Sequence, residues 1–354
     1  MIDKDNELKE EFDYLLHNSE LDPPTQQNFA MALNVSAATV TRWLNGKIEW
    51  RSSDFRRACD LLELDEEKRV HLRELVSAQR KKYRDSQSTG PNTLSSSNVQ
   101  KNNKANKIPR KPDMMLIRAG RFWMGSDPKK YSRDFQLNPT EQPYVKVYLP
   151  NYELSKTPIT NAQYADFLQK KKDKQPPPHW KNKREPPPGL EDHPVVNINF
   201  EDALDYCKWL GSTYELPTEA EWEKGARGTE GLIYPWGDEW KESHCNYGVG
   251  KMGGTTPVDK YRDYGISPYD LLDMSGNVWE WTCSTLKLYP SDPEKEPEKN
   301  PADNRNLDPN DKEPRVIRGG SFNSPLQDVR CAVRRTHNPN DKRSFIGFRV
   351  KKRL

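Results

Sequence analysis

The stretch RVIRGGSFNSPLQDVRCAVRRTHNPNDKRSFIGFRV, Arg315–Val350, decides the fold of this chain. It begins with a short β-branched run and continues into the pair Gly319-Gly320, which allows the backbone to approach other segments closely. Similar short runs occur upstream, in MMLIRAGRFWMG from Met114 and in YVKVYLPNYELSKTPIT from Tyr144. Because Gly and Pro turns separate these runs, the pattern predicts short strands joined by many loops.

Two main helices are expected in the same part of the chain. Asn161–Lys170 and Glu201–Leu210 both repeat apolar residues at helical spacing. In ELPTEAEWEKGARG, Thr218 can cap a further short helix while Glu221 returns three positions later as a capping box, with Trp222 facing the core. We expect these helices and short strands to form one domain over residues 111–354.

The segment DMSGNVWEWT, Asp273–Thr282, predicts a tight turn followed by a strand. Gly276 and Asn277 suit the turn. Trp279 and Trp281 are two positions apart, so they point to the same side of the strand. We therefore expect this segment to belong to the packed scaffold.

The N-terminal part has the apolar spacing of helices rather than short strand-like runs. Over residues 1–85 the apolar spacing predicts an all-α bundle, in which Phe12, Leu15 and Leu16 share one face of the opening helix with Leu8. Residues 86–110, SQSTGPNTLSSSNVQKNNKANKIPR, lack apolar periodicity and cannot bury enough surface to offset chain entropy. We expect this segment to be a flexible linker.

The segment TQQNFAMALNVSAATVTRWLNGK, Thr25–Lys47, resembles the helix-turn-helix of phage-repressor-like regulators. Outward polar and basic side chains of such a unit read base edges and hold phosphates. A second interpretation is a small helical bundle that binds a partner protein, because Ala37 and Ala38 carry no hydrogen-bonding groups where bases would first be met. The residues expected to bind DNA are Thr39, Thr41, Arg42, Asn45, Lys47 and Arg51.

Composition excludes several classes of protein. The 354 residues include 56 basic and 53 acidic ones, a net charge of +3, so nucleic-acid binding would need a local patch. The five cysteines show no metal-ligand spacing, which indicates reduced thiols in a cytosolic protein. The polar start MIDKDNELKEEF predicts no secretory signal, and no apolar run approaches the ~18 residues of a membrane span. We expect a cytoplasmic protein without a membrane partner.

From Met114 to Arg353 the chain resembles the formylglycine-generating enzyme family, also called the sulfatase-modifying-factor domain. The resemblance implies a variant of the C-type lectin fold. The whole chain would then be α+β: an all-α helix-turn-helix bundle, a linker, and a C-type-lectin-like domain with short strands, two main helices and many loops. The matching motifs include MMLIRAGRFWMGS, YELSKTPITNAQYADFL, HPVVNINFEDALDYCKWLG, YELPTEAEWEKGARG, YPWGDEW, YDLLDMSGNVWEWT, VIRGGSF and IGFRV.

The family carries structural calcium. By resemblance, one site would use the side chains of Asp273 and Glu280 and the carbonyls of Gly276 and Val278. Oxygen ligands around a turn suit this hard cation. Asn246 matches part of a second site, although the loop that follows it is shorter here. The alternative is that Asp273 and Glu280 cap turns or pair with arginine.

The resemblance to the oxidase members fails at their cysteine pair. Those members bind copper through two cysteines that follow the GGS motif, whereas this chain has Ser324 at the first position and no thiol in the shortened segment Pro325–Asp328. A serine hydroxyl cannot replace a thiolate on Cu(I), so no copper is expected. By resemblance, the disulfide partners of Cys207 and Cys331 are replaced, and both should be free thiols. The HxxxHxE pattern of the related iron-dependent sulfoxide synthases is also missing from the N-terminal part.

The layout of the C-terminal stretch is similar to that of a third branch of the family, the non-catalytic binders that include variable proteins of diversity-generating retroelements. This similarity implies that the exposed residues in its gaps bind a protein or other macromolecular ligand, with the N-terminal domain acting on DNA or as an adaptor. The alternative is a formylglycine-generating-type oxidase or another metal-dependent enzyme. The expected ligand-binding residues are Phe322, Ser324, Leu326, Gln327, Asp328, Val333, Thr336, His337, Lys342, Arg343 and Ser344.

Overall fold

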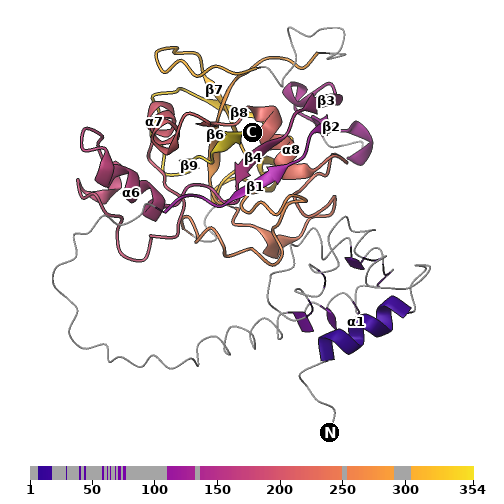
Figure 1. Cartoon of the computed structure of the whole chain (residues 1–354). Coiled ribbons are helices and arrows are strands. Elements are labelled where there is room, and N and C mark those ends of the chain that lie inside the picture. The colour runs from indigo at the N-terminus through magenta and orange to yellow at the C-terminus, as the bar shows by residue number, and fades with distance from the viewer. Residues whose placement is uncertain are drawn as a thin grey trace, which may run out of the picture. The chain divides into compact units, whose positions relative to one another are not determined.

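The computed structural model divides into two compact units, residues 1–105 and residues 106–354, which are treated separately below (Figure 1). Among the described residues, no helix is long and apolar enough to cross a membrane. The structure describes residues 7–17, 29, 40, 44, 58–59, 62, 64, 68, 71–72, 75–76, 110–131, 136–248, 253–290 and 304–354.

The N-terminal unit begins with helix α1, Glu7–His17, which confirms the expected opening helix. Phe12, Leu15 and Leu16 are buried on its inner face, and the rings of Phe12 and Phe29 meet edge to face at 4.9 Å. Val40 belongs to the same apolar cluster. The predicted DNA-binding residues Thr39, Thr41, Arg42, Asn45, Lys47 and Arg51 lie outside the described residues, as does nearly all of the predicted linker.

The described residues of the C-terminal unit form three small sheets, and their strands are as short as the sequence predicts. All pairs are antiparallel except β6 with β9, which run parallel. The first sheet has the order β1-β4-β10-β5 (Met114–Ile117, Tyr152–Ser155, Lys351–Arg353, Tyr214–Glu215). The second pairs β2 with β3 (Gly120–Met124, Val145–Leu149), and the third has the order β8-β7-β6-β9 (Arg335–His337, Arg315–Arg318, Trp279–Thr285, Ile346–Gly347).

The α-helices described among these sheets are α6 (Asn161–Lys170), α7 (Phe200–Leu210) and α8 (Glu219–Arg227). The first two are the expected main helices. The third is nearly as long, so the expectation of two main helices undercounts them. Each begins with a capping box, which satisfies backbone N–H groups that a helix start leaves unpaired. The described residues also form short 3-10 helices, which are η1 (Pro128–Lys130), η2 (Pro139–Glu141), η3 (Pro178–Trp180), η4 (Glu242–His244) and η6 (Leu326–Val329).

Aromatic side chains fill the interior of this α+β unit. One cluster joins α6 and α7 to β6, with Trp279 and Trp281 in the same cluster as predicted. A second cluster surrounds Trp222 of α8, which is buried as expected. Gly320 has a positive φ of 74°, and a Cβ there would meet Val329 Cγ1 at 2.7 Å, so the close approach inferred for the glycine pair is confirmed.

Candidate functional site

Four arginines of the C-terminal stretch each pair with a glutamate from elsewhere in the domain. The nitrogen–oxygen distance is 2.8 Å in one pair and 2.6 Å in two others, and every one of these side chains is buried. A buried charge without its partner is costly, so each pair fastens the stretch to the scaffold. The pairs are Arg330–Glu141, Arg334–Glu219, Arg349–Glu280 and Arg318–Glu223.

The short helix α8 supplies two of the four glutamates. Glu219 and Glu223 are one turn apart and therefore project from the same side of the helix. The capping box holds the start of α8, because Thr218 Oγ1 accepts from the Glu221 N–H at 3.2 Å. A third glutamate, Glu280 of β6, also accepts from the indole N–H of the neighbouring Trp222 at 2.7 Å. The motif glutamates are thus positioned as partners for arginine.

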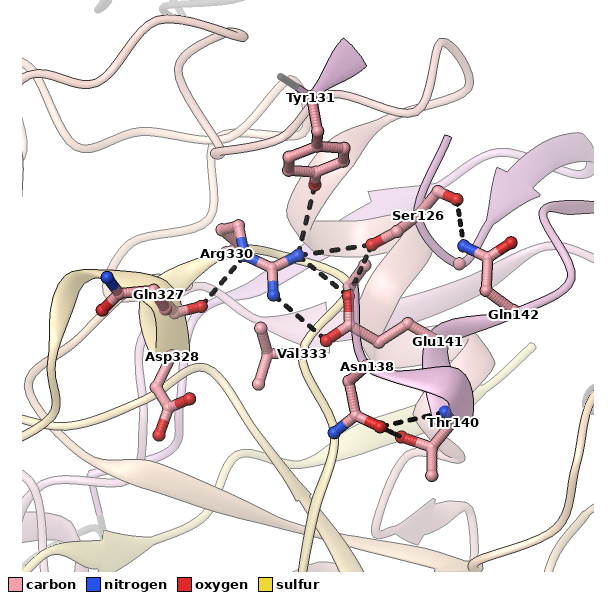
Figure 2. Close-up of polar contacts among 12 residues, drawn as sticks. Ser126, Tyr131, Asn138, Thr140, Glu141, Gln142, Gln327, Asp328, Arg330 and Val333 are labelled. Atoms are coloured by element: carbon pink, nitrogen blue, oxygen red, sulfur yellow. Dashed lines mark hydrogen bonds and ion pairs between the residues drawn. The ribbon is translucent and has the colours of Figure 1, made fainter. Parts of the chain in front are cut away.

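Arg330 ties the stretch to the polar segment that follows β2 (Figure 2). Its Nε donates to the carbonyl of Gln327 in η6 at 3.0 Å. One terminal nitrogen donates to Ser126 Oγ at 3.3 Å and to the hydroxyl of Tyr131 at 3.2 Å. Both terminal nitrogens donate to Glu141, at 2.8 and 3.1 Å. All the guanidinium nitrogens are engaged, so Arg330 acts as a structural clamp.

Ser324, at the first position of the oxidase cysteine pair, lies inside a turn. Only 4% of Ser324 is exposed. Its hydroxyl accepts from the Ser321 N–H at 3.0 Å and lies 3.1 Å from the Ser321 hydroxyl. Its carbonyl accepts from the N–H of Gly248 at 2.9 Å. The expectation that Ser324 is an exposed ligand-binding residue is therefore wrong. Among the described residues, neither serine is hydrogen-bonded to a histidine, the base that commonly activates a serine nucleophile.

Val333 is the second expected ligand residue that the structure buries. It is 1% exposed and packs in the main aromatic cluster. Its N–H donates to the Arg330 carbonyl, and its own carbonyl accepts from Arg318 at 2.7 Å. This turn directs the side chain inward, which the sequence pattern of a gap residue did not show.

The other nine expected residues reach the surface. Gln327, Thr336, Lys342, Arg343 and Ser344 are exposed, while Phe322, Leu326, Asp328 and His337 are partly buried. Residues of η6 and of β8 meet here, because Arg335 donates to Asp328 at 2.7 Å. We call these nine residues the recognition surface: Phe322, Leu326, Gln327, Asp328, Thr336, His337, Lys342, Arg343 and Ser344.

Ion pairs hold the charged part of the recognition surface in place. Asp341 pairs with His337 at 2.7 Å and with Arg343 at 3.4 Å. Lys342 reaches back to Asp202 on α7 at 2.7 Å. Such exposed pairs add little stability, but they restrict the directions in which these side chains point.

Half-buried aromatic rings border the recognition surface at Leu326. This leucine packs with Tyr131, Trp236, Trp240 and Tyr247 around a small core. Trp236 and Trp240 belong to the motif YPWGDEW, which was recognised only as a family motif and not as a neighbour of the C-terminal stretch. The density of aromatic residues in that motif was the available signal, but contact with Leu326 depends on tertiary structure.

The expected calcium ligands have other partners in this structure. Burial raises the pKa of Asp273 to about 8, although Asn277 donates to its carboxylate at 2.7 Å and Arg349 acts in the opposite direction. Both oxygens of Glu280 accept from Arg349, at 2.6 and 2.8 Å. Among the described residues, no group of three His, Cys, Asp or Glu could hold a metal ion. Glu280 is thus placed as an arginine partner, and calcium at Asp273, Gly276, Val278 and Glu280 stays a prediction.

Asn246, the residue matched to the second calcium site, is buried beside the same turn. Its side-chain N–H groups donate to the Gly254 carbonyl at 3.0 Å and to Asn277 Oδ1 at 3.3 Å. Its own Oδ1 has no hydrogen-bond partner. One buried amide oxygen is a suitable calcium ligand but does not make a site, so this prediction also stays open.

All five cysteines are buried, and Cys207 and Cys331 form no disulfide, which confirms the thiol state expected for these two. Burial raises the pKa of both Cys283 and Cys331 to about 12. The thiolate is the nucleophile and the metal ligand, so these cysteines are poorly suited to either role near neutral pH.

Comparison with known proteins agrees with this architecture. Residues 99–354 match the model of the sulfatase-modifying factor enzyme 1-like domain. Residues 21–72 match a family described only as a protein of unknown function (DUF739). The first match covers more than half of the chain.

Two relatives illustrate the range of the family. The chain is 33% identical over 258 residues to the serine/threonine-protein kinase pkn1 of Chlamydia caviae, with 68% of this chain but only 38% of that protein covered. It is 28% identical to the inactive C-alpha-formylglycine-generating enzyme 2 of Mus musculus, with 67% of this chain and 85% of that protein covered. The chain thus spans well under half of the kinase relative.

Two solved structures share the fold at low identity. PvdO from Pseudomonas aeruginosa matches with a TM-score of 0.54 and 23% identity, over 69% of this chain and 95% of that one. Treponema denticola variable protein 1 matches with a TM-score of 0.51 and 21% identity, over 68% and 95%. With the signature motifs, the paired arginines and the family match together, this chain belongs to the family of sulfatase-modifying factor enzyme 1-like domains.

Proposed function

We propose that the C-terminal unit is a ligand-binding domain without oxidase chemistry, and that the recognition surface binds a protein or other macromolecule. The observation that supports this most is Ser324, whose hydroxyl replaces the first cysteine and bonds within its own turn. No thiol remains there to bind copper. The resemblance to retroelement variable proteins agrees with such a role.

The recognition surface has the composition of a protein-binding site. It combines one aromatic residue, Phe322, with Leu326 and with polar and charged side chains on a frame of buried ion pairs. Rigid presentation of mixed side chains lowers the entropy lost on binding. An oxidase or other metal-dependent enzyme is the competing proposal, and it would need a centre other than the cysteine pair.

A capture experiment tests the surface. Tagged full-length protein would carry Thr336→Arg with Ser344→Arg, and the matched control would carry Ser212→Arg, which changes an exposed serine elsewhere in the same unit. We expect at least one bound macromolecule, quantified by mass spectrometry, to be lost from the surface variant and kept by the control. Equal capture by all forms would reject the surface as the binding site.

For the N-terminal unit we propose DNA binding or an adaptor role that links the recognition domain to a partner protein in the cytoplasm. Arg42→Ala and Arg51→Ala test the first option by gel-shift titration at several salt concentrations. Loss of phosphate contacts lowers both the affinity and its dependence on salt. Unchanged affinity in both variants would leave the adaptor role.

A further inference from the structure

The outer face of strands β2 and β3 alternates cations with aromatic rings. On β2, Arg121 is exposed and Trp123 is partly exposed, while the residues between and after them are buried. On β3, Lys146 and Tyr148 are exposed between buried neighbours. The antiparallel register places Arg121 opposite Tyr148 and Trp123 opposite Lys146. Each cation therefore faces an aromatic ring across the strand pair.

The rings of this face are available to a flat ligand. Tyr148 is 54% exposed. Trp123 stacks on Tyr144 with centroids 4.6 Å apart and planes at 11°, and Lys146 Nζ lies 4.9 Å from the Trp123 ring. Stacking of a base on an aromatic ring is stronger than an exposed cation–π contact. A base can therefore replace Lys146 on the Trp123 ring, and the lysine can then turn toward a phosphate.

The two strands themselves are basic, although Tyr144, whose pKa is raised by burial, also lies close enough to Asp127 and Asp238 for them to raise this pKa further. Residues 114–124 and 144–149, which include both strands and the turn before β2, contain three basic residues and no Asp or Glu. These are Arg118, Arg121 and Lys146, all exposed. The whole 354-residue chain carries a net charge of only +3, so these two segments are more basic than the chain as a whole. Figure 1 shows the two strands side by side, separate from the β6–β9 sheet.

We propose that this face binds single-stranded nucleic acid, with bases stacked on Tyr148 and on the Trp123–Tyr144 pair and phosphates held by Arg118, Arg121 and Lys146. Single-strand binders combine a positively charged track with aromatic platforms in this way. An acidic peptide would use the cations and leave the rings without a partner. The site uses other residues than the recognition surface, so it does not depend on the function proposed above.

Fluorescence anisotropy of a labelled 15-nucleotide oligo(dT) tests the proposal on the full chain. We expect Tyr148→Ala to weaken binding about tenfold, which corresponds to ~1.4 kcal/mol. Lys146→Ala should weaken binding and reduce the slope of log affinity against log salt by about 0.7, the loss of one phosphate contact on a single strand. The matched controls are Tyr264→Ala and Lys241→Ala, an exposed tyrosine and an exposed lysine elsewhere in the unit, and they should bind as the unmodified chain does.

Four results would overturn the assignment. The unmodified chain could fail to bind oligo(dT), or Tyr148→Ala and Lys146→Ala could bind it as the controls do. A polyglutamate peptide of matched charge could also displace oligo(dT) as well as unlabelled oligo(dT) does, which would make the face a site for acidic protein. Variants of the N-terminal unit leave the two strands unchanged, so binding lost only in Arg42→Ala would place the nucleic acid there instead.

Discussion

At the scale of single residues, Arg349 joins several segments of the C-terminal unit. It donates to Glu280 of β6 through two nitrogens, and to the carbonyls of Ser155 and Leu272 at 2.9 and 2.8 Å. Arg349 and Glu280 are both fully buried. The arginine thus satisfies one buried carboxylate and two carbonyls that would otherwise lack partners.

Replacing Arg349 should be among the most damaging single changes in the unit. Arg349→Met leaves Glu280 buried without its counter-charge, which lowers the free energy of unfolding by about 3–5 kcal/mol. The double change Arg349→Met with Glu280→Gln should be less damaging, because no uncompensated charge remains. Urea unfolding measures both, with Arg353→Met as the control at an exposed arginine. A loss below about 1 kcal/mol in Arg349→Met would contradict the assigned role.

Because Lys224 is buried, we expect the free energy of unfolding to depend on pH through this residue. It is buried, its Nζ donates to the carbonyls of Arg118 and Gly120 at 2.7 and 2.9 Å, and burial lowers its pKa to about 8. The unfolded chain keeps this proton up to about pH 10.4. Between about pH 8 and about pH 10.4, Lys224 is therefore protonated more often in the unfolded chain than in the folded one. The contribution of Lys224 to the free energy of unfolding then rises with pH.

The urea midpoints at pH 7.5 and pH 9.5 measure this effect by comparison with Lys224→Met. We expect the unmodified chain to gain stability relative to the variant over this interval. The comparison removes contributions from other titrating groups, which both proteins share. A constant difference between the two proteins would show that Lys224 titrates normally in the folded state.

At the scale of elements, helix α8 positions both the core tryptophan and two of the paired glutamates. Thr218→Ala removes the hydroxyl that caps the helix and should lower the free energy of unfolding by about 1 kcal/mol. Thr213→Ala is the matched control, since Thr213 is exposed in the turn before β5. Equal stability of the two variants, measured by thermal or urea unfolding, would mean that the cap contributes nothing.

Local signals predicted the elements of the C-terminal unit well. Helical spacing identified α6 and α7, and the Thr218 to Glu221 spacing identified the cap of α8, because these patterns depend on neighbours in the chain. The partner of Arg330 could not be predicted, since Glu141 is 189 positions away and only the fold brings the two together. The inward direction of Val333 was missed for the same reason. A gap residue in a motif is exposed or buried according to the turn that carries it.

At the scale of the whole molecule, we predict that any calcium binding is weak and depends on Asp273. Arg349 already neutralises Glu280, so Asp273 would be the one unpaired carboxylate among the four expected ligands. Calcium affinity falls when a site has fewer charged ligands. We therefore expect weak binding, with a dissociation constant on the order of 10⁻⁴–10⁻³ M measured by calorimetry. Asp273→Ala should abolish the heat of binding. A submicromolar affinity, or one unaffected by that change, would place calcium elsewhere.

We propose that the protein recognises one molecule and acts through another. The family scaffold is kept by buried arginine–glutamate pairs, while the turn that holds copper ligands in oxidases is closed by the hydroxyls of Ser321 and Ser324. As proposed, recognition and nucleic-acid binding would use two separate groups of exposed residues. The fold alone decides neither, because one fold supports many activities.

The most direct test of this account is incubation of the full chain with copper, oxygen and a cysteine-containing peptide, followed by mass spectrometry of the peptide. We predict that the cysteine stays unconverted, because Ser324 supplies no thiolate and the segment Pro325–Asp328 after it contains no thiol. A catalytically competent family member in parallel shows that the conditions support turnover. Oxygen-dependent conversion of the cysteine to formylglycine by this chain would contradict the central claim.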